Sequence, residues 1–138
     1  MQGDKMEILL SLVIPTNGVI EWVIPVLDSI FKQDVDKSLY EVVVTDNGNC
    51  KEFREKMNKL CLVHNNLVYK KTTSVLFMNQ IDAFKLAKGK FIKFINHRTK
   101  LNEGALQNLI DFIKINQYEK PITFFLNSAC KIEKKPNF

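Results

Sequence analysis

Short apolar runs alternate with segments of helical periodicity along the whole sequence, and this alternation constrains the fold more than any other feature. Nearly continuous apolar runs that end at turn-forming residues are typical of strands buried on both faces of a sheet. Between them, apolar residues recur at the spacing of amphipathic helices. The expected strands are residues 8–14, 40–45, 67–69, 91–95 and 122–126, and the expected helices lie around residues 19–33, 53–60, 77–84 and 102–113. Such alternation predicts an α/β fold, a mostly parallel sheet with helices on both faces.

The composition is that of a soluble globular protein and predicts a single domain, residues 1–138, with 46% apolar and 25% charged residues. No apolar run approaches the roughly 18 residues that cross a bilayer. The net charge of +5 comes almost wholly from Lys, since Arg54 and Arg98 are the only arginines. Because base-reading side chains are often Arg, we expect no nucleic-acid partner.

The cysteine count bears on location. Three cysteines without metal-like spacing are typical of reduced cytoplasmic thiols, so we expect a cytoplasmic protein. A basic surface is also attracted to anionic membranes, which leaves peripheral association with the inner face of the membrane open.

Polar clusters follow three of the expected strands, at the point where each strand ends. If the strands are ordered third, second, first, fourth, the clusters meet at the edge where parallel sheets bind ligands. Asp, Asn and Gly also build ordinary turns, so each cluster has a structural explanation as well. The clusters are Pro15-Thr16-Asn17, Asp46-Asn47-Gly48 and Asn96-His97-Arg98.

Common catalytic and phosphate-binding motifs are absent from the sequence. Neither glycine-rich phosphate loop, GxGxxG or GxxxxGK[ST], occurs, and there is no His-x-x-x-His pair. The residues alone therefore leave open an unrelated nucleotide-binding protein of the α/β class, for which Asp46 and the polar strand ends are the support.

Five segments, taken in order, carry a resemblance to a known family. They are residues 11–17 (SLVIPTN), 27–33 (LDSIFKQ), 40–48 (YEVVVTDNG), Asn79 with 87–95 (AKGKFIKFI), and Leu101 with 103–106 (EGAL). In this order they resemble family 2 glycosyltransferases with the GT-A fold, over about residues 10–126. The resemblance implies a Rossmann-like three-layer sandwich and, in the full-length protein, transfer of a sugar from a nucleoside-diphosphate sugar to an acceptor hydroxyl.

The resemblance also implies a donor site at the strand ends. Asp46 would accept a hydrogen bond from the base, which suits UDP- or GDP-linked sugars because uracil and guanine carry a ring N–H. The other implied contacts are Pro15, Thr16 and Asn17 against the base and ribose, Asn47 in the acidic turn, Lys71 beside the nucleotide, and Asn79 beneath the diphosphate.

The metal motif departs from the family pattern. An acidic pair is expected after the fourth strand, and this chain has Asn96, His97 and Arg98 instead. Hard cations prefer carboxylate oxygens, so Asn96 and His97 would hold Mn²⁺ or Mg²⁺ only weakly. Alternatively, Arg98 itself neutralises the diphosphate, since its planar guanidinium suits bidentate phosphate contacts.

The length is the second departure. Enzymes of this family continue past the fifth strand into an acceptor-binding half that carries the catalytic base, and we find no catalytic residue here. We therefore expect the donor-binding half of a transferase, truncated after about the fifth strand and inactive on its own. The alternative is a non-catalytic nucleotide-binding or self-associating remnant of the same fold. An apolar edge at residues 122–126 would favour pairing with another chain, so we expect a homo-oligomer.

Overall fold

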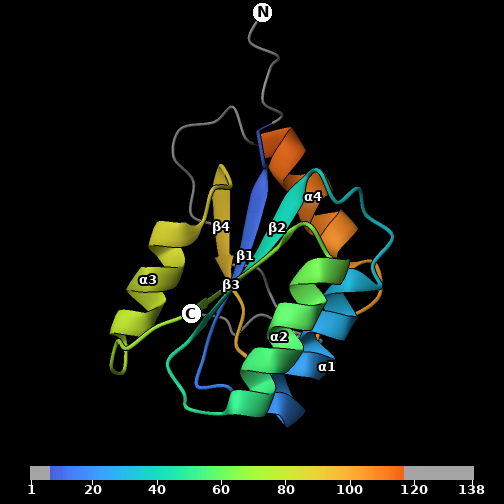
Figure 1. Cartoon of the computed structure of the whole chain (residues 1–138). Coiled ribbons are helices and arrows are strands. Elements are labelled where there is room, and N and C mark those ends of the chain that lie inside the picture. Colours follow the sequence, from blue (N-terminus) through green and yellow to red (C-terminus); the bar gives the residue numbers. More distant parts are fainter. Residues whose placement is uncertain (1–6, 117–138) are drawn as a thin grey trace, which may run out of the picture.

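Four parallel strands form one sheet in the order β3-β2-β1-β4 (Figure 1). The computed structural model describes residues 7–116, so the expected strand at 122–126 lies outside the described residues. The strands are β1 (Leu10–Thr16), β2 (Tyr40–Asp46), β3 (Leu67–Lys71) and β4 (Phe91–Phe94). The helices are α1 (Ile20–Phe31), α2 (Lys51–Val63), α3 (Met78–Leu86) and α4 (Ala105–Asn116). The predicted α/β fold and strand order are confirmed.

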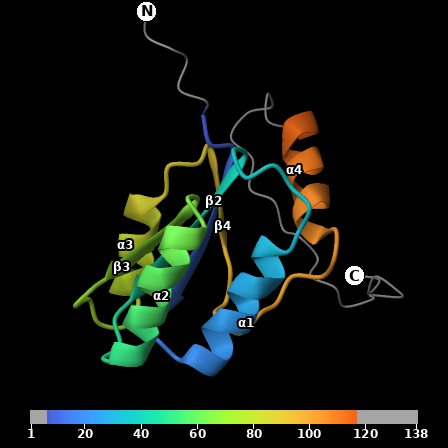
Figure 2. The ribbon, with the colours of Figure 1, turned by 45° about the vertical axis from the view of Figure 1, so that its right-hand side comes forward.

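The larger core lies on one face of the sheet, beneath α1, α2 and α4 (Figure 2). Alternate residues of β1, such as Leu12 and Ile14, meet the apolar stripes of these helices. All residues of the strand except Pro15 are buried, because both its faces are covered. Helix α4 contributes the stripe that its periodicity predicts, and its members Leu106, Ile110 and Ile113 are buried. Burial of this continuous apolar face provides most of the driving force for folding.

The opposite face is smaller and more polar, and α3 is the described helix that covers it (Figure 2). Here the Ser11 hydroxyl donates to a carboxylate oxygen of Glu41 at 2.6 Å, and the Lys88 N–H donates to the same oxygen at 2.6 Å. The Gly89 N–H donates to Ser11 Oγ at 2.8 Å, and a Cβ on Gly89 would lie 2.5 Å from the Ser11 nitrogen. These contacts hold the α3–β4 turn against the amino ends of β1 and β2.

The apolar residues that the sequence places on one face of α3 point away from the sheet. Phe77, Ile81 and Phe84 are 76%, 43% and 56% exposed, whereas Asn79 and Ala83 are buried. The physical reason is Asn79, whose side chain is bonded to the ends of two strands and so determines which face of α3 meets the sheet. Among the described residues, no helix is long and apolar enough to span a membrane.

Candidate functional site

The carboxyl ends of the strands bring the first two polar clusters into direct contact. Thr16 of β1 lies opposite Asp46 of β2, which in turn lies opposite Lys71 of β3. The Asn47 N–H donates to the Thr16 carbonyl at 3.1 Å. A Cβ on Gly48 would lie 1.8 Å from the Asn17 carbonyl oxygen, so the two turns are packed backbone to backbone. The expected meeting of these clusters at one edge is therefore observed.

Asp46 lies at the centre of this edge and is only 1% exposed. Its Oδ1 accepts the Gly48 N–H at 2.8 Å, and its Oδ2 accepts the Tyr69 hydroxyl at 2.7 Å. Gly18 has φ +79°, and a Cβ there would approach Asp46 Oδ1 to 2.9 Å, so glycine is required on both counts. The carboxylate is thus buried at the end of β2, between the turn that follows β1 and Tyr69 of β3.

Tyr69 is a member of this site that the sequence analysis missed. Burial raises the pKa of the Tyr69 hydroxyl, and the hydrogen bond to Asp46 and its negative charge raise it further, so the phenol remains a donor. Its ring packs edge-on against Phe53, with centroids 6.0 Å apart. The one available signal was register: Tyr69 lies two residues before Lys71, on the same face of β3.

The Asn79 side chain lies below the edge and forms hydrogen bonds with the ends of the strands. Its Nδ2 donates to the Thr16 carbonyl at 3.1 Å and to the Thr45 carbonyl at 3.0 Å. Its Oδ1 accepts the Thr72 hydroxyl at 3.0 Å, and the Thr72 N–H donates to the Asp46 carbonyl at 2.8 Å. The amide is 3% exposed and its polar atoms are bonded to the protein, so Asn79 positions β1, β2 and the residue after β3.

The third polar cluster reaches the same edge through His97. His97 Nδ1 lies 2.8 Å from Thr16 Oγ1, which also accepts the Gly18 N–H at 3.1 Å. Either Thr16 donates to an unprotonated Nδ1 or the ring N–H donates to the hydroxyl oxygen, which can accept two hydrogens. Burial lowers the pKa of His97, and the adjacent Arg98 charge lowers it further, which favours the neutral ring.

Arg98 is stacked on an indole. Its guanidinium carbon lies 3.5 Å from the centroid of the Trp22 ring, and the His97 ring meets the same indole edge-on at 5.1 Å. Trp22 lies in the first turn of α1, away from the apolar stripe that predicted this helix, so the sequence analysis did not single it out. The sequence pattern carries no signal for a contact between residues 76 positions apart.

The other predicted contacts differ in what they offer a ligand. Asn17 is exposed and Pro15 half-buried. Lys71 Nζ donates to the neighbouring Thr72 carbonyl at 2.9 Å, and Asn47 Nδ2 donates to the Ser74 carbonyl at 3.0 Å. Their side chains therefore stabilise the loop after β3 in this structure.

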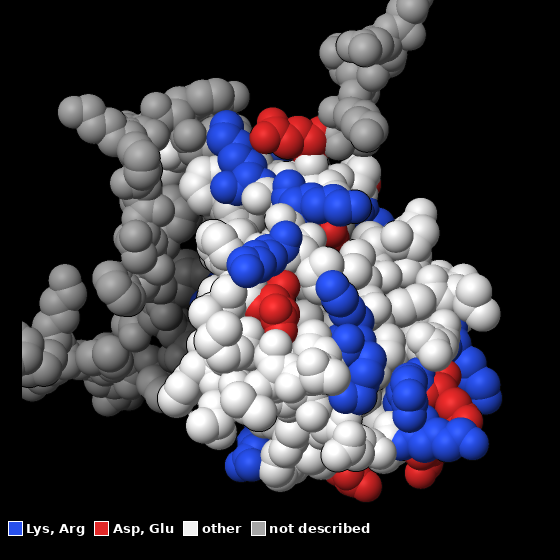
Figure 3. All heavy atoms as spheres, turned by 60° about the vertical axis from the view of Figure 1, so that its left-hand side comes forward, with Lys and Arg blue, Asp and Glu red and all other residues white. Residues whose placement is uncertain are grey.

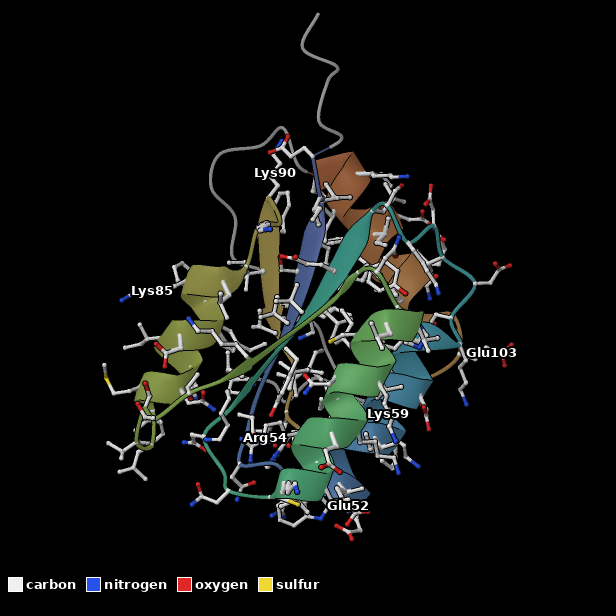
Figure 4. The ribbon with its side chains drawn as sticks, in the orientation of Figure 1. Glu52, Arg54, Lys59, Lys85, Lys90 and Glu103 are labelled. Carbon is white, nitrogen blue, oxygen red and sulfur yellow. The ribbon has the colours of Figure 1, made fainter. Side chains whose placement is uncertain are left out.

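A further cation lies near this edge. Figure 4 shows Arg54 and Glu52 near the carboxyl ends of the strands, and the charge of Arg54 acts to lower the pKa of Tyr69. The same view shows Lys90 at the opposite end of the sheet. Arg54 thus adds positive charge on the α2 side, as Arg98 does on the α1 side.

Asn96 and His97, the expected metal ligands, do not fit a hard divalent cation. Asn96 Oδ1 accepts the Arg98 N–H at 2.9 Å, and His97 Nδ1 is bonded to Thr16. Between residues 7 and 116, no three His, Cys, Asp or Glu side chains gather into a metal site. The Arg98 cation adds repulsion beside both donors. Weak Mn²⁺ or Mg²⁺ binding by these two side chains remains a prediction.

A separate cleft of about 680 Å³ lies between the end of α1 and the start of α4. Its lining mixes cations such as Lys32 and Lys100 with Asp34 and Glu103, so it has no consistent charge for an anionic ligand. Figure 4 shows Glu103 on the far side of α1 from the strand ends. This cleft is distinct from the polar edge, where the predicted residues meet.

Comparison with known proteins agrees with this fold. The sequence profile described as glycosyl transferase family 2 matches residues 11–129. TarS from S. aureus (residues 1–349) is 24% identical, with a TM-score of 0.70 over 79% of this chain and 33% of that one. The same protein in complex with UDP-GlcNAc gives 23% identity and a TM-score of 0.69, covering 79% and 32%.

A second similar structure comes from another organism. The mannosyltransferase PcManGT from Pyrobaculum calidifontis, in complex with GDP-Man and Mn²⁺, is 18% identical, with a TM-score of 0.66 over 75% of this chain and 32% of that one. The chain thus spans about a third of the length of these structures. The sequence matches no curated protein.

Replacing Asn79 tests whether its amide holds the strand ends. We expect Asn79→Ala to lower the free energy of unfolding by about 2–4 kcal/mol, because two strand carbonyls and a threonine hydroxyl lose a buried partner. Asn58→Ala, at an exposed position of α2, is the matched control and should change stability little. Urea unfolding measures both, and equal stabilities of the two variants would contradict the positioning role.

Stability should also depend on pH through the two histidines. Burial lowers the pKa of His64, whose ring stacks on Phe31 with the ring centroids 3.9 Å apart. Burial lowers the pKa of His97 as well. Because both folded pKa values lie below 6.5, the stability is fully present above that pH and falls as the pH drops through the folded values. Urea midpoints at about pH 7.5 and about pH 5.5 measure the loss. The double variant His64→Gln/His97→Gln should flatten the profile, and an unchanged slope would contradict the assignment.

Proposed function

The chain belongs to glycosyl transferase family 2, and we propose that its polar sheet edge binds the nucleotide part of a nucleoside-diphosphate sugar. The observation that carries the proposal is a separation of charge at one edge. The buried carboxylate of Asp46 lies opposite Thr16 on the neighbouring strand. His97 contacts the Thr16 hydroxyl, and the guanidinium of the next residue, Arg98, stacks on Trp22. A carboxylate suits the ring N–H of uracil or guanine, and a guanidinium suits a diphosphate.

Structures of similar fold support this choice of ligand class. TarS has crystal structures in complex with UDP and with UDP-GlcNAc, and PcManGT has a structure in complex with GDP-Man and Mn²⁺. On this proposal, Pro15, Thr16 and Asn17 pack on the base and ribose, with Asn47 and Lys71 beside them. Asn79 supports the site from beneath, because its amide already bonds the ends of β1 and β2 and Thr72.

The reaction itself is proposed for the longer protein. There, a base would deprotonate an acceptor hydroxyl, which attacks the anomeric carbon as the nucleoside diphosphate leaves. We assign no described residue to the role of that base, so the described residues contribute donor binding. The diphosphate charge would be met by Arg98, with Mn²⁺ or Mg²⁺ adding little because the donor set at Asn96 and His97 does not fit.

Calorimetric titration with UDP and GDP tests the donor site. We expect the wild type to bind one of them, and Asp46→Ala to weaken that binding by about 1.5–3 kcal/mol, as for a lost hydrogen bond to a charged group. Tyr69→Phe is the control, because it removes a contact of Asp46 and keeps the carboxylate. Arg98→Ala should weaken binding more than EDTA does.

Three outcomes would contradict this account. Absence of UDP and GDP binding by the wild type would overturn the donor site. Equal affinities of wild type and Asp46→Ala would remove Asp46 from it. A gain of about tenfold or more from Mn²⁺, about 1.4 kcal/mol, would restore Asn96 and His97 as metal ligands.

A self-associating module is the second candidate, and the outer surface of α3 favours it. Figure 3 views this side of the molecule, where a largely uncharged surface is bordered by Lys and Arg. Clustered exposed apolar side chains mark interaction surfaces. The exposed apolar residues here are Val75, Leu76, Phe77, Met78, Ile81 and Phe84. We propose that a second copy of the 138-residue chain covers them.

Light scattering tests this pairing. The wild type should exceed the monomer mass at high micromolar concentration, and Phe77→Ser/Phe84→Ser should shift it towards the monomer because two large apolar contacts are lost. Leu62→Ser, at a highly exposed site on α2, is the control and should leave the mass unchanged. A monodisperse wild-type monomer would contradict self-association.

A further inference from the structure

We propose that Trp22 is a positioning residue that holds the guanidinium of Arg98 on its indole face, with its N–H donors turned to the diphosphate of the bound nucleotide. The inference rests on the proposed function and adds a residue and a mechanism to it. It begins from the stack itself, in which the guanidinium carbon lies 3.5 Å from the ring centroid. At that separation the cation contacts the π face directly, an arrangement that favours Arg over Lys.

The stacking contact does not use the N–H donors of the Arg98 guanidinium. A guanidinium carries five N–H donors in its plane, and contact through its face uses none of them. Among residues 7–116, no carboxylate forms an ion pair with Arg98. Arg98 is also exposed. A cation held in one orientation with free donors at an exposed edge is suited to a bidentate phosphate contact.

Neighbouring contacts fix both members of the stack to the polar edge. Trp22 is half-buried in the first turn of α1, directly after the β1–α1 turn. The His97 ring packs edge-on against the same indole, and its Nδ1 is bonded to Thr16 Oγ1. Asn96 Oδ1 accepts the Arg98 N–H, which shapes the turn that carries the guanidinium. The chain therefore positions Arg98 before any ligand arrives.

This positioning has a definite consequence for affinity. A long, exposed arginine loses rotamer freedom when it binds an anion, and a side chain already held on an aromatic face loses less. Removing the indole should therefore weaken binding of the diphosphate while leaving binding of the uncharged nucleoside unchanged. Trp22→Phe keeps a smaller aromatic face and should recover part of the loss.

The test exploits the fact that Trp22 is the only tryptophan in the chain. Inorganic pyrophosphate and the nucleoside diphosphate are titrated against the wild type, with indole fluorescence and calorimetry as readouts. We expect both ligands to change the Trp22 emission, and Arg98→Ala to abolish that change. In calorimetry, Trp22→Leu should lower the affinity for both ligands by about tenfold, and Trp22→Phe should lower it by less.

A double-mutant cycle separates positioning from a general structural effect. In the Arg98→Ala background, Trp22→Leu should cost no further affinity, because the indole acts through the guanidinium. Equal losses from Trp22→Leu with and without Arg98 would overturn the inference, as would unchanged indole emission on adding pyrophosphate. Absence of UDP and GDP binding alongside a pyrophosphate response that depends on Arg98 would overturn the proposed nucleotide site and leave the stacked anion site standing. Thermal unfolding of each variant confirms that it is folded.

Discussion

The carboxyl edge of the sheet depends on one buried side chain, the amide of Asn79. Its Nδ2 donates to the carbonyls of Thr16, at the end of β1, and of Thr45, one residue before the end of β2, and its oxygen accepts the hydroxyl of Thr72 after β3. Because a buried amide must be satisfied, these bonds determine the rotation of α3 about its axis. The same rotation places Phe77 and Phe84 outward, so a local polar requirement creates the exposed apolar surface.

The two charged groups at this edge, Asp46 and Arg98, lie in different environments. Asp46 is buried and accepts hydrogen bonds from Tyr69 and the Gly48 N–H, whereas Arg98 is exposed and restrained through the face of an aromatic ring. The acid is therefore a positioned acceptor, and the cation is accessible to a solvated anion. In the proposed donor site, the permanent cation of Arg98 would take the place of the acidic metal ligands that the family resemblance implies, which is the basis for expecting binding that a chelator barely affects.

The alternation of strands and helices was readable from the sequence because β1 and β2 are almost wholly buried and α1, α2 and α4 each bury one apolar face. The meeting of Thr16, Asp46 and His97 followed from strand order alone. Contacts set by tertiary packing were not readable, because the pairs Trp22–Arg98 and Ser11–Glu41 join residues far apart in the chain. The apolar run at residues 8–14 predicts a buried strand but does not indicate which residue bonds the Ser11 hydroxyl. The outward face of α3 was missed because periodicity marks a face without saying which side is buried.

The most direct test of the account is an amide chemical-shift map of the ¹⁵N-labelled chain with UDP or GDP. If the polar edge binds the nucleotide, the largest shifts will fall on the backbone amides of Gly18, Gly48 and Thr72 and on the indole N–H of Trp22. These groups lie on or beside Asp46, Thr16 and Arg98. Shifts confined to Gly104 and Gln107, in the cleft between α1 and α4, would contradict the account.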